Sequence, residues 1–190
     1  MDLRYGEGMD ENLLHRLRAF LQPFYQDLDG VSRFDDVERI TAIARRLYVP
    51  PSPEDARAFE LLLHFHGLGE WLEKIGNLSR TVLALGDLTK TELRRTAASI
   101  RRLGKPSTEA ERAVAAAILI DGAGVRGLAE RLSRARREGQ SVADVVRGTL
   151  ADAETPEWLS DEALRWVAER RDLRRAFCRA ILDEMRVGAG

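Results

Sequence analysis

Apolar residues recur at three- and four-residue intervals along most of the chain, whereas stretches that alternate at every second residue between turn signals are scarce. The first spacing places apolar side chains on one face of a helix, and the second is typical of half-buried strands. The pattern therefore predicts an all-α protein, a single-domain helical bundle over residues 1–190 with about seven to nine helices.

Glycine, proline and capping residues divide this pattern into separate helices. Pro23 falls inside the first helix, where we expect a bend or an interruption. Thr89-Lys90-Thr91-Glu92 and Thr108-Glu109-Ala110-Glu111 are capping boxes that predict two later helix starts. The expected helices cover about residues 13–28, 37–47, 53–66, 70–85, 90–100, 109–118, 125–138, 142–150 and 161–185.

Two of these helices differ from the others in their apolar residues. The helix over 53–66 is apolar on all sides at Leu61-Leu62-Leu63, which places it at the centre of the core. The C-terminal helix carries Trp166 and Phe177 and follows Trp158, and aromatic residues of this kind are enriched in protein interfaces. Two interpretations stay open for it, a partner interface and closure of the domain's own core, and we favour the second.

Composition narrows the class of protein. The 30 basic residues nearly balance the 31 acidic ones, so the overall charge does not support nucleic-acid binding. The longest apolar run, Ala113 to Ile120, is too short for a membrane span of about 20 residues. Met1 to Asp10 holds no apolar segment of signal-peptide length, which predicts a cytoplasmic protein. The lone Cys178 is expected to be a small side chain that is buried or half-buried.

Histidines and aspartates supply the candidate metal ligands. His64 and His66 are two positions apart on a predicted helix, so their side chains point to nearly opposite sides. One of them could bind a metal only together with carboxylates from other helices. A packed or solvent-facing histidine is the alternative. The first connection between helices is crowded by four aspartates that could bind a cation or cap the next helix, and capping is the interpretation we favour. These aspartates are Asp27, Asp29, Asp35 and Asp36.

Basic residues supply the candidate ligand site. Arg101, Arg102 and Lys105 could converge on a phosphate, because guanidinium groups match phosphate oxygens, and His66 is a further candidate ligand-binding residue. Solvated helix faces are the alternative for these charges. A second basic group, Arg134, Arg136 and Arg137, follows later in the chain and could converge on the same phosphate.

The order of four segments carries more information than any single residue. They are Phe34-Asp35-Asp36-Val37-Glu38-Arg39-Ile40, Glu60-Leu61-Leu62-Leu63-His64-Phe65-His66-Gly67, Ala98-Ser99-Ile100-Arg101-Arg102-Leu103-Gly104-Lys105-Pro106 and Asp121-Gly122-Ala123-Gly124-Val125-Arg126-Gly127-Leu128-Ala129. In order and approximate spacing, these segments resemble the HD superfamily of metal-dependent phosphohydrolases. The resemblance covers about residues 24–150.

The resemblance implies an HD-type helical fold and a metal site. That site would consist of a histidine on an early helix, a His-Asp doublet at the end of a central helix, and a distant aspartate. In this chain Asp36 stands at the early histidine position, His64 matches the doublet histidine, and Phe65 stands at the doublet aspartate. Ala116, or a neighbour in the apolar run Ala113 to Ile120, aligns with the distant aspartate, and Asp121 matches an acid a few residues beyond it.

These departures lead to two functional hypotheses. A divalent ion needs several oxygen or nitrogen ligands to activate water and orient a phosphate. The family often has an additional histidine at the position of Leu103. Neither Leu103 nor Phe65 can supply a metal ligand. We therefore expect a degenerate, non-catalytic HD-like domain that has no cofactor. We expect it to bind a protein partner or a phosphate-bearing small molecule, and it could form a homodimer. The alternative is a phosphohydrolase that holds a divalent metal with an atypical ligand set around His64, formed with Asp35 or Asp36, His66 and Asp121.

Overall fold

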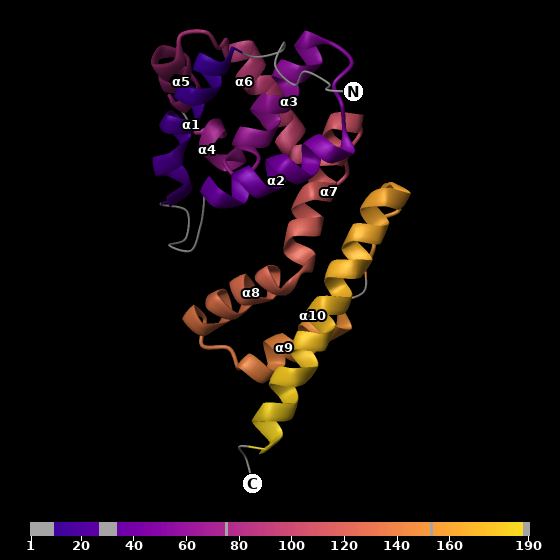
Figure 1. The fold of residues 1–190 in the computed structure, drawn as a ribbon. Helices are drawn as coiled ribbons and strands as arrows, with labels where there is room; N and C mark the ends of the chain where they lie inside the picture. The colour runs from indigo at the N-terminus through magenta and orange to yellow at the C-terminus, as the bar shows by residue number, and fades with distance from the viewer. Residues whose placement is uncertain (1–9, 27–33, 75, 153, 188–190) are drawn as a thin grey trace. The chain divides into compact units, whose positions relative to one another are not determined.

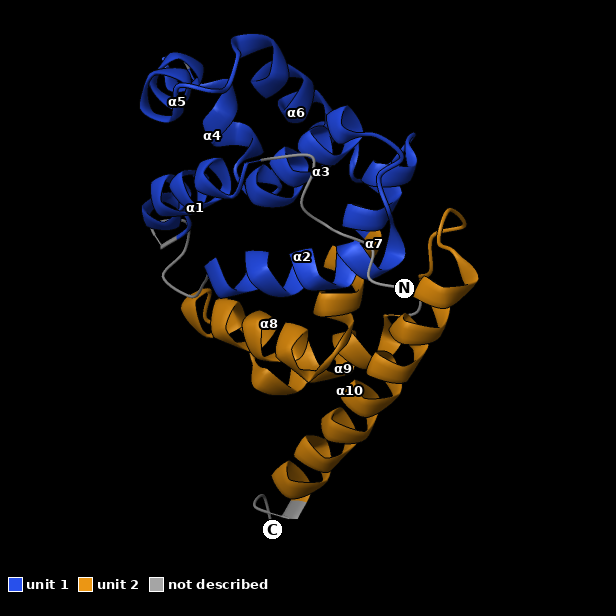
Figure 2. Cartoon of the chain, turned by 45° about the horizontal axis from the view of Figure 1, so that its top comes forward, with its two compact units in different colours: residues 1–115 blue, residues 116–190 orange. Residues whose placement is uncertain are grey.

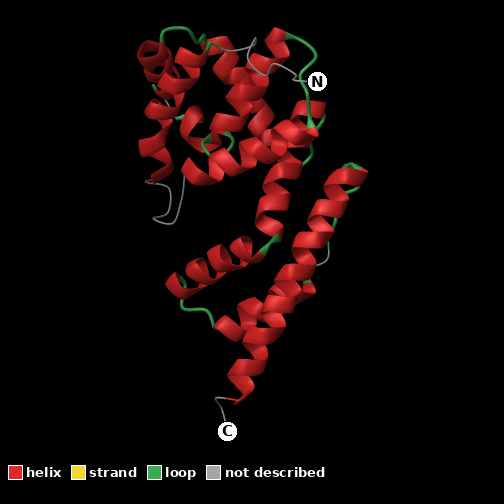
Figure 3. Ribbon diagram, in the orientation of Figure 1, coloured by secondary structure: helices red, strands yellow, loops and turns green. Residues whose placement is uncertain are grey.

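The computed structural model describes residues 10–26, 34–74, 76–152 and 154–187. In these ranges the chain forms ten helices joined by loops and turns, and it contains no strand (Figure 3). The all-α prediction is confirmed. Among the described residues, no helix is both long enough and apolar enough to cross a membrane.

The chain divides into two compact units, residues 1–115 and 116–190 (Figure 2). Each unit has its own buried core. The expectation of one domain over residues 1–190 stays a prediction, because compactness of the two units does not decide whether they fold together.

The first unit contains six complete helices and the first half of a seventh (Figure 1). Its first helix continues through Pro23 without interruption. The single helix expected over 70–85 is two helices, because Gly76 between them has a φ of 88°, in the left-handed region that glycine adopts without strain. The seven helices are α1 (Glu11–Gln26), α2 (Phe34–Leu47), α3 (Pro53–Phe65), α4 (Gly69–Glu73), α5 (Asn77–Leu85), α6 (Lys90–Arg102) and α7 (Glu109–Ala123).

Local capping explains where several of these helices begin. The Ser52 hydroxyl accepts a hydrogen bond from the Asp55 amide at 3.1 Å at the start of α3. At the start of α6, the predicted capping box is complete: Thr89 Oγ1 accepts from the Glu92 amide, and the Glu92 carboxylate accepts from the Thr89 amide. Each pair satisfies amides that have no partner within the helix.

Helix α3 lies at the centre of the first unit, as its all-round apolar sequence predicts. It packs against α1, α2 and α6, and every residue from Phe59 to Phe65 is buried. Leu61 and Phe65 belong to a core that also takes leucines from α1, α4, α5 and α6. Because the second half of α3 is buried, the polar side chains there, Glu60 and His64, have little access to water.

The second unit is built around three helices, α8 (Val125–Arg137), α9 (Val142–Ala151) and α10 (Asp161–Val187), which all contact one another. Leu128, Val146 and Cys178 form its buried core, so the expected burial of the cysteine is confirmed. The turn from α7 into α8 requires glycine, because a Cβ atom on Gly127 would overlap the backbone carbonyl of Gly122.

Candidate functional site

His64 is a buried polar residue of the first unit, and its ring is held by hydrogen bonds. Its side chain is 1% exposed, and both of its ring nitrogens have a partner. Nδ1 lies 2.8 Å from the carbonyl oxygen of Glu60, one turn earlier in α3. Nε2 lies 3.4 Å from Nε of Arg18, on α1. Because the arginine can only donate, Nε2 is the acceptor, and Nδ1 carries the hydrogen that is donated to the Glu60 carbonyl.

The surroundings of His64 keep its ring neutral. Burial lowers the pKa of His64 to about 4, and the positive charges of Arg18 and Arg45 act in the same direction, while the hydrogen bond to the Glu60 carbonyl opposes them. The ring is therefore an uncharged hydrogen-bonding group near neutral pH, and it bridges α1 and α3.

Glu60 extends this polar centre toward α2. Its Oε1 accepts hydrogen bonds from Nε and Nη2 of Arg45, at 3.0 and 2.7 Å. Its other oxygen, Oε2, is buried, forms no hydrogen bond with any described residue, and lies 3.6 Å from Nδ1 of His64. Arg18, His64, Glu60 and Arg45 thus form one partly buried network from three helices, with two positive charges and one negative charge.

Tyr25 fixes the end of α3 beside this network. Its hydroxyl donates to the His64 carbonyl at 2.8 Å and accepts from the Gly67 amide at 3.2 Å. Burial raises the pKa of Tyr25, so the hydroxyl keeps the hydrogen that it donates. A Cβ atom on Gly67 would lie 2.8 Å from Cε1 of the tyrosine, and glycine therefore suits this position. The sequence offered no signal for Tyr25 or Arg18, because both fall in an ordinary amphipathic helix.

The aspartates proposed as metal ligands lie in different places. Asp36 is in the first turn of α2 and forms an ion pair with Arg39, which fits a capping role. Asp35 is exposed in the same turn, and Asp27 and Asp29 lie outside the described residues. Asp121 is buried in the second unit. Across the described ranges, no three His, Cys, Asp or Glu residues form a group that could hold a metal ion.

Three of the predicted ligand-binding residues have protein partners in the first unit. Arg101 pairs with Glu73 at 2.9 Å on the surface, and His66 is half-buried, with Nδ1 2.7 Å from the Leu63 carbonyl. Arg102 donates from Nε and Nη2 to Oε1 of Glu111, at 3.0 and 2.6 Å. Lys105 is exposed in the loop after α6.

Glu111 connects the end of α6 to the start of α7. Its second oxygen accepts from the Ser107 amide and hydroxyl, each at 2.9 Å, and the Thr108 hydroxyl accepts from the Glu111 amide as the capping box predicts. Burial disfavours the charged form of Glu111, but the hydrogen bonds from Arg102 and Ser107 outweigh it and lower its pKa to about 2. The Arg102 guanidinium therefore binds a buried carboxylate of the same unit.

A second cluster, which the sequence did not indicate, lies in the second unit. Arg174 of α10 is only 2% exposed, and its Nε and Nη2 form no hydrogen bond with any described residue. The carboxylate of Asp152 lies 3.8 Å from Arg174 and 2.9 Å from Arg131 of α8. Arg171 anchors the loop after α9 by donating to Thr155 and to the carbonyl of Glu154. Burial lowers the pKa of Arg174, and Arg131 acts in the same direction.

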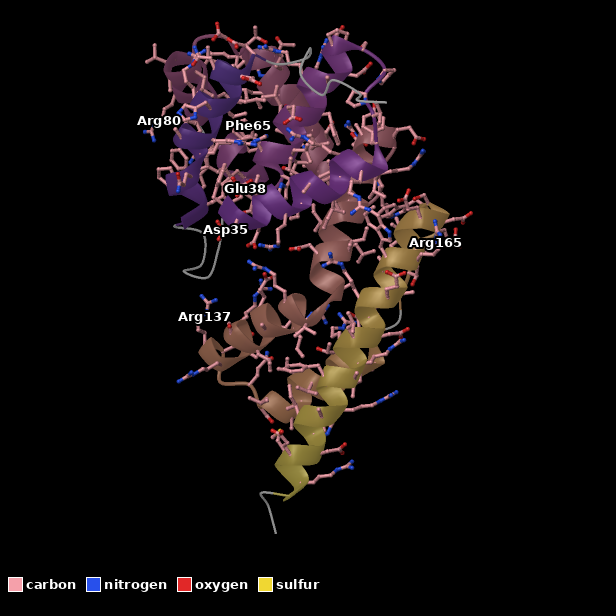
Figure 4. The ribbon with its side chains drawn as sticks, in the orientation of Figure 1. Asp35, Glu38, Phe65, Arg80, Arg137 and Arg165 are labelled. Carbon is pink, nitrogen blue, oxygen red and sulfur yellow. The ribbon has the colours of Figure 1, made fainter. Side chains whose placement is uncertain are left out.

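A cavity of about 220 Å³ opens between α8 and α9 beside this cluster. Arg131 and Arg134 line it from α8, and Glu138 and Gln140 line it from the loop that follows. The amide of Gln140 donates to the Glu138 carboxylate at 3.0 Å. Arg137, from the same basic run, is exposed and extends away from the helix (Figure 4).

No protein-family model matches this sequence, and neither a curated protein nor a solved structure is significantly similar to it. The HD resemblance therefore depends on the quoted segments alone and stays a prediction.

Proposed function

We propose that the chain is an HD-like helical domain that acts by binding and does not hydrolyse phosphoesters. One observation carries this proposal: His64, the only position where the resemblance retains a histidine ligand, has both ring nitrogens engaged inside the first unit. A metal ion would need the lone pair of Nε2, which accepts from Arg18, and it would approach a guanidinium charge.

The residue after His64 supports the same conclusion. Phe65 stands where the resemblance implies a carboxylate, and it is fully buried in the apolar core of the first unit (Figure 4). A carboxylate at this position would need a cation or several donors to offset its burial, whereas the phenyl ring is stabilised by packing alone. The helices therefore have a stable core that requires no metal.

The test is metal binding combined with a phosphoesterase screen on the full chain. Titration of chelator-treated protein with Mg²⁺, Mn²⁺, Co²⁺ or Zn²⁺ should show no stoichiometric site that depends on His64, and no phosphoester should turn over above the buffer rate. His15 is exposed on α1, so His15→Gln is the matched control for His64→Gln. Turnover that is lost in His64→Gln and kept in His15→Gln would overturn the proposal and establish the alternative, a hydrolase with an atypical ligand set.

The surface of α10 favours a second candidate function, self-association. Leu173 and Phe177 are 66% and 47% exposed and lie one turn apart on this helix. Phe177 is seven residues from Arg170 and seven from Glu184, so all three residues lie close to one face, and both charged residues are exposed. A second copy that packs antiparallel about Phe177 would place Arg170 opposite Glu184 twice, whereas parallel packing would place like charges together.

This second candidate is tested by sedimentation over a range of concentrations. We expect an apparent mass that rises from 21.4 kDa to about twice that value. Arg170→Glu should abolish the rise, and adding Glu184→Arg should restore it. Arg186→Glu is the control, because Arg186 lies on the opposite side of α10 from Phe177. A monomer at all concentrations, or equal loss in the control, would remove this candidate.

A further inference from the structure

We propose that the cavity between α8 and α9 binds the phosphate group of a small phosphate-bearing molecule through Arg131 and Arg134. This inference depends on the proposed binding function and deepens it by naming the class of ligand. It places the ligand in the second unit, which holds Arg134 of the later basic group, whereas Arg101, Arg102 and Lys105 belong to the first unit.

The donors that line the cavity suit a phosphate. Arg131 and Arg134 are one turn apart on α8, so their guanidinium groups extend from the same face. The Arg134 guanidinium forms no hydrogen bond or ion pair with another described residue. Glu138, the carboxylate in the lining, already accepts a hydrogen bond from Gln140. Two guanidinium groups on one wall can bind phosphate oxygens in a forked geometry that lysine cannot reproduce.

Asp152 connects the cavity to the buried Arg174. Its Oδ2 lies 2.9 Å from Nη2 of Arg131 and 3.8 Å from Nη2 of Arg174, so a single carboxylate is shared by two cations. Nε and Nη2 of Arg174 are buried and form no hydrogen bond with any described residue, and buried charged donors in that condition destabilise the fold. A phosphate on Arg131 would replace Asp152 there, and the carboxylate could then close on Arg174. Arg174 is therefore a positioning residue, which acts on the ligand through Asp152.

The size of the cavity limits the ligand. Its volume of about 220 Å³ is below the roughly 300 to 1,000 Å³ of typical sites for drug-sized molecules. Inorganic phosphate or a short phosphate monoester therefore fits the space better than a larger organic molecule.

The experiment is calorimetric titration of the full chain with inorganic phosphate and with glycerol phosphate, at an ionic strength held constant with NaCl. We expect saturable binding that weakens about tenfold or more in Arg131→Gln and in Arg134→Gln. Arg147→Gln is the control, because Arg147 forms an exposed pair with Asp144 on α9. Circular dichroism checks that each variant keeps its helices.

Variants of Asp152 and Arg174 test the coupling between the cavity and the buried arginine through changes in phosphate affinity. Asp152→Asn releases Arg131 and should tighten phosphate binding about threefold or more, whereas Asp144→Asn, the same charge change on α9, should leave the affinity unchanged. Arg174→Gln should weaken binding in the native background and have no further effect in Asp152→Asn, because both act through one contact.

The proposal is overturned if phosphate gives no more heat than NaCl, if Arg147→Gln weakens binding as much as Arg131→Gln, or if Asp144→Asn matches Asp152→Asn. These outcomes are independent of His64. If phosphate binds and turnover depends on His64, the proposed function is wrong and this phosphate site still holds. If phosphate does not bind and no phosphoester turns over, this site is wrong and the proposed function still holds.

Discussion

Arg18 on α1 and His64 on α3 meet at 3.4 Å between Nε and Nε2, although 46 positions separate them in the chain. The contact uses the acceptor of a neutral, buried imidazole, which is the same lone pair that a metal ligand would offer. The histidine is therefore a structural hydrogen-bonding residue in this arrangement, and its protonation state is coupled to the stability of the first unit.

That coupling predicts a pH dependence. The pKa of His64 is lowered from 6.5 to about 4 in the fold, so the unfolded chain takes up a proton between these values and the folded chain does not. Stability should therefore fall by about 3 kcal/mol as the pH decreases from 6.5 to 4. Urea denaturation at intervals of half a pH unit measures this slope, and His64→Gln should flatten it. A slope that persists unchanged in His64→Gln would assign the effect to other groups.

Glu111 predicts a stability difference between two neighbouring carboxylates. Its side chain is 1% exposed and binds Arg102 and Ser107, whereas Glu109 is 74% exposed and pairs with Arg112 on the surface. Glu111→Gln should destabilise the first unit by about 2 to 3 kcal/mol, and Glu109→Gln by less than about 0.5 kcal/mol.

The same network adds a second pH effect. The pKa of Glu111 is lowered from 4.5 to about 2, so the stability it contributes is present above pH 4.5 and is lost as the pH falls toward 2. Urea denaturation of both variants at pH 7 and pH 3 checks the two statements. Equal effects of the two substitutions would show that the internal network contributes no more than a surface pair.

Glycine positions in the second unit predict opposite effects of the same substitution. Gly127→Ala would place a Cβ atom against the Gly122 carbonyl, and moving that backbone should cost about 2 to 3 kcal/mol. Gly148 lies inside α9 with no atom near its missing Cβ, so Gly148→Ala should stabilise the helix by up to about 1 kcal/mol. Thermal melting followed by circular dichroism distinguishes them. If both substitutions shift the melting temperature in the same direction, the close approach between position 127 and the Gly122 carbonyl is contradicted.

Cys178 predicts slow chemical labelling. It is fully buried in the core of the second unit, and burial raises the pKa of its thiol, so the reactive thiolate is both scarce and shielded. An opening free energy of about 3 kcal/mol would by itself slow the reaction roughly 100-fold. Reaction with a thiol reagent at pH 8, compared with the chain in concentrated urea, measures the ratio. Similar rates in both conditions would mean that the second unit does not protect this residue.

The sequence predicted features that depend on neighbours along the chain. The capping boxes at Thr89 and Thr108 form as expected because a helix start is decided within four residues. The break at Gly76 was missed, because a lone glycine is tolerated in a helical pattern and only the observed φ shows that a second helix starts after it.

The candidate sites were predicted less well. Arg102 was named as a candidate phosphate ligand, and its guanidinium binds an internal glutamate. No local pattern distinguishes an arginine that binds a phosphate from one that pairs with a buried carboxylate. Arg174 was missed altogether, because a run of arginines on a helix is most often solvated.

The sequence by itself determined the helical class, most helix positions and the central place of α3, because periodicity and capping are local properties. Only the tertiary structure decided that His64 faces Arg18, that Glu111 binds Arg102, and that Arg174 is buried beside a shared carboxylate. The partners of these groups come from other helices, and burial makes each interaction strong enough to set the charge and role of the side chain.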